Sequence, residues 1–338
     1  MIRNILGKVV NGENLSEEEA MKVMDFIMEG RATSAQVAGL LAALKTKGET
    51  VDEITGFVRS MKNKAIKVDV DEEYCIDTCG TGGDGLSTFN ISTASAFVVA
   101  AGGCKVAKHG NRSITSQCGS ADVLEALGIN IELNSYEVKE CIKEVGIGFM
   151  FAPIFHSSMR YAAGPRRELG IRTVFNILGP LTNPAQVKGQ ILGVFAPELT
   201  EFMGHVLIRL GIERGLVVYG MDGMDEISPF THTKVTEIRD GEIITYEISP
   251  ENFGLERKEG HLIGGDAVCN AQIIMDIFKG QRDCRRDAVI LNSAGALYVG
   301  KAVDSISDGI EMASEIIDSG AAYNKIMELA SFTRRYGR

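Results

Sequence analysis

The sequence lacks a hydrophobic run long enough to cross a membrane. No stretch of its 338 residues approaches the roughly 20 apolar residues that a membrane-spanning helix requires. The first residues lead into a polar helical pattern and not into the apolar core of a signal peptide. We therefore expect a cytoplasmic protein that has no membrane as a partner.

Positive charge is scarce. The chain has 35 lysines and arginines against 45 aspartates and glutamates, which gives a formal net charge of -10. Proteins that bind duplex nucleic acid displace its counterions with a basic surface, so this balance argues against nucleic acid as a partner. An anionic ligand would need the basic residues to be concentrated in one place, or a metal ion to help.

Cysteine pairs with metal-site spacing are also absent. The chain has seven cysteines, an odd number, and no two of them stand at the two-residue spacing of zinc sites. Cys79 lies beside a glycine-rich stretch, where a reactive thiol is conceivable. Without a sign of secretion, we interpret all seven as reduced, small hydrophobic side chains.

Three capping boxes mark the starts of short helices in the first 70 residues. In such a box, two side chains three residues apart satisfy free backbone amides at the start of the helix. The pairs are Ser16 with Glu19, Thr33 with Gln36, and Thr50 with Glu53. Helices this short need a surface against which to bury their apolar face. We predict a small helical domain over residues 1–70 that packs on the main body or on a partner subunit.

Strands and helices alternate beyond a charged, hinge-like segment at residues 61–73. Residues 189–219 have the pattern of a strand, a helix and a strand, which is typical of a parallel sheet. The Asp240-Gly241 dipeptide predicts a hairpin. Further strands are predicted at 74–77 and 104–107, and helices at 93–101, 121–127 and 308–329. The predicted fold class is α/β: a small N-terminal α-helical domain plus a large α/β domain, residues 71–338, with a mostly parallel central sheet.

A glycine-rich loop, residues 80–85, follows the first predicted strand. Its glycines permit positive φ angles and let backbone amides approach an anion closely. Gly80, Gly82 and Gly85 satisfy the G-x-G-x-x-G dinucleotide pattern, but the helix proper begins seven residues later and the next strand ends in Lys108 instead of an acid. No Gly-Lys-Ser/Thr sequence follows, which excludes a nucleoside-triphosphate loop. The loop is therefore predicted to bind phosphates.

A basic turn, residues 108–112, follows the adjacent predicted strand. Lys108 and Arg112 bracket a Gly-Asn turn, so their charges and several free amides converge. An isolated turn of this kind would be interpreted as exposed surface. Because parallel strands end at one edge of the sheet, this turn should lie beside the glycine loop, which favours a role in binding the same phosphates.

The sequence resembles the anthranilate phosphoribosyltransferase family over essentially its whole length. The motifs that carry the resemblance are residues 80–85 with 90–93, 108–112 with 119–122, Arg166 with 172–184, and Asp225-Glu226. The resemblance implies a fold shared with pyrimidine nucleoside phosphorylases, with a ligand cleft between the two domains. It also implies a homodimer joined through the helical domain, which would be completed by helices near residues 166–184.

The resemblance further implies the site residues. Phosphoribosyl pyrophosphate (PRPP) would be bound by Gly80, Gly83, Asp84, Thr88, Asn90, Ile91, Ser92, Thr93, Lys108, His109, Gly110, Asn111, Arg112, Ser113, Ile114, Thr115, Ser116 and Ser120. Anthranilate would be bound by Gly80, Asn111 and Arg166. Magnesium, two ions per subunit, would be bound by Ser92, Asp225 and Glu226.

The implied reaction moves a ribosyl carbon from pyrophosphate to an arylamine. This amine is a neutral nucleophile, so no catalytic acid or base is expected, and Lys108 and Arg112 would position and stabilise the leaving group. A guanidinium such as that of Arg166 fits a carboxylate with two hydrogen bonds. Arg167 is an alternative partner for anthranilate, and Asp222 is an alternative metal ligand.

Two other functions are compatible with the same fold. A pyrimidine nucleoside phosphorylase would use phosphate as the nucleophile, but it would not need the Asp225-Glu226 pair. A non-catalytic relative that binds nucleic acid would have a basic groove and broken substrate motifs, whereas this chain is acidic and its motifs are intact.

Overall fold

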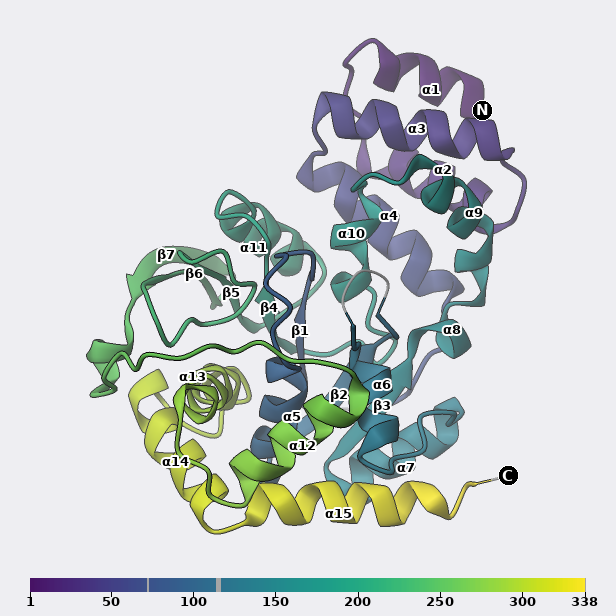
Figure 1. Ribbon diagram of the computed structural model, residues 1–338. Helices are drawn as coiled ribbons and strands as arrows, with labels where there is room; N and C mark the ends of the chain where they lie inside the picture. Colours follow the sequence, from purple (N-terminus) through teal and green to yellow (C-terminus); the bar gives the residue numbers. More distant parts are fainter. Residues whose placement is uncertain (72, 114–116, 338) are drawn as a thin grey trace.

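Four short helices occupy the first 64 residues of the chain. A computed structural model describes residues 1–71, 73–113 and 117–337. The three predicted capping boxes are confirmed, at Ser16, Thr33 and Thr50. Helix α2 packs against α4, and α1 packs against α3 (Figure 1). The bounds are α1 Ile2–Val10, α2 Glu17–Met28, α3 Ser34–Lys47 and α4 Val51–Lys64.

A seven-stranded sheet forms the centre of the rest of the chain. Its strand order is β3-β2-β1-β4-β5-β6-β7. The first five strands in this order pair in parallel, and only β6 and β7 add antiparallel pairs. The predicted fold class is therefore confirmed. The strands are β1 Cys75–Gly80, β2 Lys105–Gly110, β3 Ile147–Phe151, β4 Gly189–Gly193, β5 Arg214–Gly220, β6 Thr233–Arg239 and β7 Glu242–Ile248.

The predicted hairpin is confirmed at Asp240 and Gly241. Both residues have positive φ angles, 54° and 81°, which a two-residue turn between twisted antiparallel strands requires. Arg239 pairs with Glu242 directly beside the turn. The hairpin forms one edge of the sheet and lies away from helices α1 and α3 (Figure 1).

Helices cover the sheet. Helix α13 packs against α5, α14 and three of the strands, while α11 packs against β5, β6, β7 and also α4 of the bundle (Figure 1). Helix α12 packs on α6, and α7 packs on β3. The bounds are α5 Ile91–Ala101, α6 Ser120–Ala126, α7 Ser135–Val145, α11 Leu199–Arg209, α12 Ala267–Phe278, α13 Cys284–Val299, α14 Ile306–Asp318 and α15 Ala321–Arg334.

Three short helices between β3 and β4 return the chain toward the bundle. They are α8 Ala152–Phe155, α9 Arg160–Leu169 and α10 Phe175–Leu178. Helix α9 contacts α2 and α3, and α10 contacts α4 (Figure 1). The connection after α4 is held from the same region, because Ile66 N–H donates to Phe155 O and Val68 N–H donates to Pro184 O.

The prediction of one helix over residues 308–329 is wrong. The tail forms two helices, α14 and α15, which are separated at Ser319 and Gly320. Gly320 has a φ of 76°, a left-handed conformation that ends one helix and lets the chain turn into the next. Over the described part of the chain, no helix is both long and apolar enough to span a membrane.

Candidate functional site

The predicted loops meet at one edge of the sheet. Strands β1, β2, β4 and β5 are parallel, so the segments that follow them emerge on the same side. These segments include the glycine loop, the basic turn and the Asp225-Glu226 pair. This edge faces the helical bundle, with α9 and α10 above it (Figure 1).

The conformation of the glycine loop is fixed by positive φ angles and by one carboxylate. Gly82, Gly83 and Gly85 have φ angles of 63°, 79° and 79°, which side chains rarely adopt. The Gly82 N–H donates to Asp225 Oδ2 at 2.8 Å. A Cβ atom at Gly80 would overlap the same carboxylate, so Asp225 packs directly on the loop.

The Asp225-Glu226 pair bridges the loop to the start of α5. Glu226 Oε1 accepts a hydrogen bond from Ser92 N at 3.1 Å, so two of the predicted metal ligands lie together. Burial raises the pKa of Asp225 to about 6, and the Asp84 carboxylate adds to this rise. Burial and Asp225 also raise the pKa of Glu226 well above its usual value.

These acidic groups fit a hard cation such as Mg²⁺. Asp84 Oδ2 is buried and has no hydrogen-bond partner among the described residues. Three neighbouring carboxylates, those of Asp84, Asp225 and Glu226, beside the glycine loop match the oxygen ligands that Mg²⁺ prefers. Within the described ranges, no group of three His, Cys, Asp or Glu residues is arranged to hold a metal by itself. A site of this kind needs substrate phosphates to complete the coordination.

Lys108 lies beneath the loop. Its side chain is 3 % exposed, and its ammonium donates to the Thr78 carbonyl of β1. Burial lowers the pKa of Lys108, and the Asp77 carboxylate opposes this effect. Lys108 therefore places its ammonium beside Thr78 of β1, where the Asp77 and Glu226 carboxylates act on it.

His109 and Gly110 continue from Lys108 at the end of β2. The His109 ring lies 5.1 Å from the ring of His156, and its Nε2 is buried without a partner among the described residues. Burial lowers the pKa of His109 to about 3. A Cβ atom at Gly110 would overlap Ser120, so the turn packs tightly against the start of α6.

Arg112 is exposed, and acidic residues of α6 engage it. Its guanidinium donates to Asp122 Oδ1 at 2.8 Å and to Glu125 Oε1 at 2.9 Å. The Glu125 and Asp122 carboxylates raise its pKa above the usual value. The motif alone does not predict this pairing, which neutralises the charge that the resemblance assigns to phosphate binding.

The rest of the basic turn is closed by backbone contacts. Asn111 Oδ1 accepts from Arg112 N at 2.8 Å, and Asn111 O accepts from Ser120 Oγ at 3.3 Å. Ser113 N donates to Asp122 Oδ2 at 3.2 Å. The predicted contacts at Ile114, Thr115 and Ser116 lie outside the described residues.

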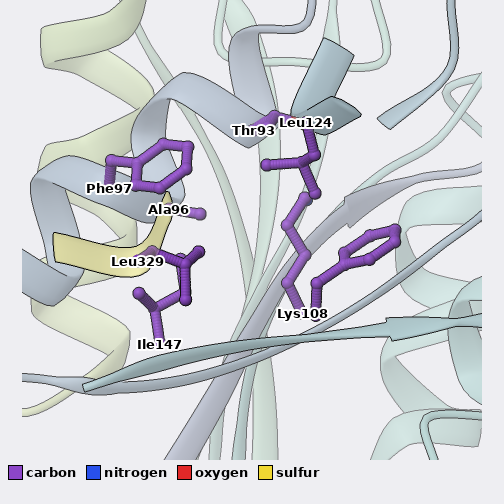
Figure 2. Close-up of a pocket in the computed structure, with 8 residues that line it drawn as sticks. Thr93, Ala96, Phe97, Lys108, Leu124, Ile147 and Leu329 are labelled. Atoms are coloured by element: carbon purple, nitrogen blue, oxygen red, sulfur yellow. The ribbon is translucent and has the colours of Figure 1, made fainter. Parts of the chain in front are cut away.

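The remaining predicted PRPP residues surround the start of α5. Thr88 pairs with Ile263 in an antiparallel bridge. Ile91 is buried, and Thr93 is buried with its hydroxyl unpaired among the described residues. A small cavity behind this helix is lined by Thr93, Ala96, Phe97, Lys108, Leu124, Ile147, Phe149 and Leu329, and Figure 2 shows seven of them labelled. Its mostly apolar lining excludes it as a phosphate site.

Arg166 lies on α9, in the segment that returns toward the helical bundle. Its guanidinium stacks on the Phe175 ring, 4.9 Å from the centroid, and burial lowers its pKa. Among the described residues, no acid forms an ion pair with it. A half-buried guanidinium without a counterion is a suitable receptor for a carboxylate.

Two further side chains tie separate segments of the site together. Arg172 donates to Gly83 O and stacks on Phe195 at 4.8 Å, which ties the segment after α9 to the glycine loop. Asn183 Nδ2 donates to Asp77 Oδ2 at 2.8 Å and to Ala107 O at 2.7 Å, which holds β1 and β2 together beneath the site. Only long-range contacts reveal the role of Asn183.

Comparison with known proteins identifies the family. Residues 3–65 match the helical bundle domain of the glycosyl transferase family, and residues 72–323 match its a/b domain. The anthranilate phosphoribosyltransferase of Acetivibrio thermocellus is 59% identical over 337 residues, which cover 99% of this chain and 98% of that protein.

Solved structures agree with this result. The crystal structure of anthranilate phosphoribosyltransferase from Thermus thermophilus is 43% identical, with a TM-score of 0.92 over 97% of this chain and 99% of that chain. The Saccharomyces cerevisiae enzyme in complex with PRPP and Mg is 28% identical, with a TM-score of 0.89 over 99% of this chain and 98% of that chain. With such similarity along nearly its whole length, the chain belongs to the anthranilate phosphoribosyltransferase family.

Proposed function

We propose that this chain transfers the phosphoribosyl group of PRPP to the amine of anthranilate. The products are N-(5-phosphoribosyl)anthranilate and pyrophosphate, and the step belongs to tryptophan biosynthesis. Family membership supports this proposal, and one observation carries it in the structure. The Gly82 N–H donates to Asp225, which unites the phosphate-binding loop with the acidic pair at a single strand edge.

In this proposal, the glycine loop and the start of α5 bind PRPP. Free amides of the loop would donate to the pyrophosphate, and Lys108 would stabilise its developing charge from below. Two Mg²⁺ ions per subunit would be held by Ser92, Asp225 and Glu226, with Asp84 beside them. Bound magnesium would neutralise the leaving group. The yeast relative, whose structure contains PRPP and Mg, supports this assignment.

Anthranilate would bind on the bundle side of the strand edge. Arg166 would pair with its carboxylate, and Asn111 with Gly80 would border the amine. No side chain needs to remove a proton before attack, because an arylamine is neutral at pH 7. Catalysis would therefore depend on holding the amine in line with the ribosyl carbon and on excluding water.

Three further properties belong to the same proposal. The chain would act as a cytoplasmic homodimer joined through the helical bundle. Residues 1–70 would form the small domain, completed by α9 and α10, which pack on it. Residues 71–338 would form the large domain, with the substrates in a cleft between the two.

Loss of anthranilate fluorescence after addition of PRPP and Mg²⁺ tests the activity directly. We expect the fluorescence to fall only when the enzyme and both additions are present. Unchanged fluorescence would reject the proposal. Release of thymine from thymidine and phosphate would point to a nucleoside phosphorylase. Salt-dependent retention on DNA, without transfer, would point to a nucleic-acid-binding relative.

A further inference from the structure

A short strap from the C-terminal half of the chain crosses the end of the glycine loop. The strap, residues 262–265, leads into helix α12. Phe89 N–H donates to Leu262 O at 2.9 Å, and Gly264 N–H donates to Ser87 O at 2.9 Å. These bonds flank the antiparallel bridge at Thr88. The strap therefore fixes the segment that connects the glycine loop to α5.

Asn270 of α12 joins the strap to this segment. Its side chain is 1 % exposed. Asn270 Oδ1 accepts from Gly265 N at 2.7 Å, and Asn270 Nδ2 donates to Asn90 Oδ1 at 2.9 Å. Because a backbone N–H can only donate, Gly265 determines which end of the Asn270 amide faces Asn90.

Asn90 connects Asn270 to Cys118, which lies just before the start of α6. Its Nδ2 donates to Cys118 O at 3.3 Å, while its Oδ1 also accepts from Cys118 Sγ at 3.4 Å. If the Asn90 amide were flipped, two NH₂ groups would face each other at Asn270 and two oxygens at Cys118. The directed chain of hydrogen bonds therefore permits one orientation of the Asn90 amide between Asn270 and Cys118.

We infer that Asn270 is a positioning residue for PRPP. Acting through Asn90, it sets the spacing between the segment after the glycine loop and Cys118, which directly precedes the start of α6, although it belongs to neither. This inference rests on the proposed function. Both polar atoms of the Asn90 side chain are used by the protein, so this side chain organises the segment after the glycine loop.

Substitution of Asn270 separates positioning from stability. Asn270→Ala should raise the KM for PRPP about tenfold and leave the KM for anthranilate within about twofold, because one buried bond to a binding loop is lost. Thr333→Val is the matched control: Thr333 is 1 % exposed and accepts from Asn130 N at 3.1 Å, in α15. It should lower the melting temperature without changing either KM. If Asn270→Ala does not fold, Asn270→Asp keeps the volume and still removes the donor to Asn90.

A double-mutant cycle tests whether Asn270 affects PRPP binding through Asn90. If Asn270 acts through Asn90, then Asn90→Ala with Asn270→Ala should raise the KM for PRPP no more than Asn90→Ala alone. Additive effects, or equal losses for both substrates, would overturn the inference. An inactive unsubstituted enzyme would instead reject the proposed function, so the two failures are distinguishable.

Discussion

Asp225 accepts a hydrogen bond from the backbone amide of Gly82 at 2.8 Å. A proposed metal ligand and a proposed phosphate-binding loop are therefore one structural unit, although 143 residues separate them in the chain. The Asp84 carboxylate, which lies close by, adds to the rise that burial causes in the pKa of Asp225. A cation at this point would offset this rise in the pKa of Asp225.

Asp225→Asn should reduce transferase activity about 100-fold at low magnesium. The amide oxygen can still accept from Gly82, so the loop should remain in place while the negative charge is lost. Higher magnesium concentrations should restore part of the rate. The rate as a function of Mg²⁺ concentration is the measurement, and full activity at low magnesium would remove Asp225 from the site.

Asp222→Asn is the control for this prediction. Asp222 lies three residues before Asp225 in the chain and is exposed, and its carboxylate accepts from Ser228 Oγ at 2.6 Å. The Asp222→Asn variant should therefore show the same activity and magnesium dependence as the unsubstituted enzyme. A magnesium dependence altered in Asp222→Asn but not in Asp225→Asn would exchange their roles.

Arg166→Ala should weaken anthranilate binding far more than PRPP binding. Loss of a charge-assisted pair with the carboxylate should raise the KM for anthranilate about 30-fold or more. Initial rates at varied concentrations of each substrate provide the test. Arg167→Ala, which alters an exposed neighbour, is the control and should change neither KM. Equal weakening of both substrates by Arg166→Ala would indicate a structural role.

The features that the sequence predicts well have local signals. The three capping boxes, the glycine loop after β1 and the Asp240-Gly241 hairpin each depend on residues a few positions apart. Helix α13 gives no such signal, because it is buried on nearly every side and lacks an amphipathic pattern. The periodic tail predicts one helix, since its apolar stripe continues across the break at Gly320.

The partners of site residues are less predictable than their identities. The motif around Arg112 indicates a positive turn, but its pairing with Asp122 and Glu125 depends on how α6 folds back. Likewise, Asn270 lies 180 residues from Asn90, and only the tertiary structure brings the two amides together. Contacts between distant segments have no counterpart in local spacing.

Glu53→Ala should destabilise the bundle more than an ordinary capping mutation. Besides closing the box at Thr50, the Glu53 carboxylate accepts from Leu15 N at 2.9 Å and pairs with Lys47 at 2.9 Å, both out of water. Its removal leaves buried partners unsatisfied and should lower the free energy of unfolding by about 3 kcal/mol.

Urea denaturation measures this loss. Glu19→Ala is the matched control, because Glu19 closes the box at Ser16 and pairs with Lys8, but both side chains are partly exposed. It should lower the free energy of unfolding by about 1 kcal/mol or less. Similar losses in the two variants would show that the buried contacts of Glu53 contribute little.

His156→Gln should flatten the pH dependence of stability. His156 is 7 % exposed, its Nε2 lies 3.0 Å from Thr182 O, and burial lowers its pKa to about 4. The unfolded side chain titrates near its usual pKa of 6.5. The folded state therefore favours the neutral ring, and its stabilising contribution is complete above pH 6.5 and is lost as the pH falls toward 4.

Because the pKa of His156 differs this much between the folded and unfolded states, the free energy of unfolding should fall by about 2 kcal/mol between pH 7 and pH 4.5. Urea denaturation at several pH values would detect it. A glutamine amide can still donate to Thr182 O but carries no proton to titrate, so this part of the acid destabilisation should disappear. The neighbouring His109 titrates in the same direction and should leave a residual slope. His205→Gln, which changes an exposed ring, is the control and should leave the dependence of stability on pH unchanged. If His156→Gln also left it unchanged, His156 would not be a source of the acid sensitivity.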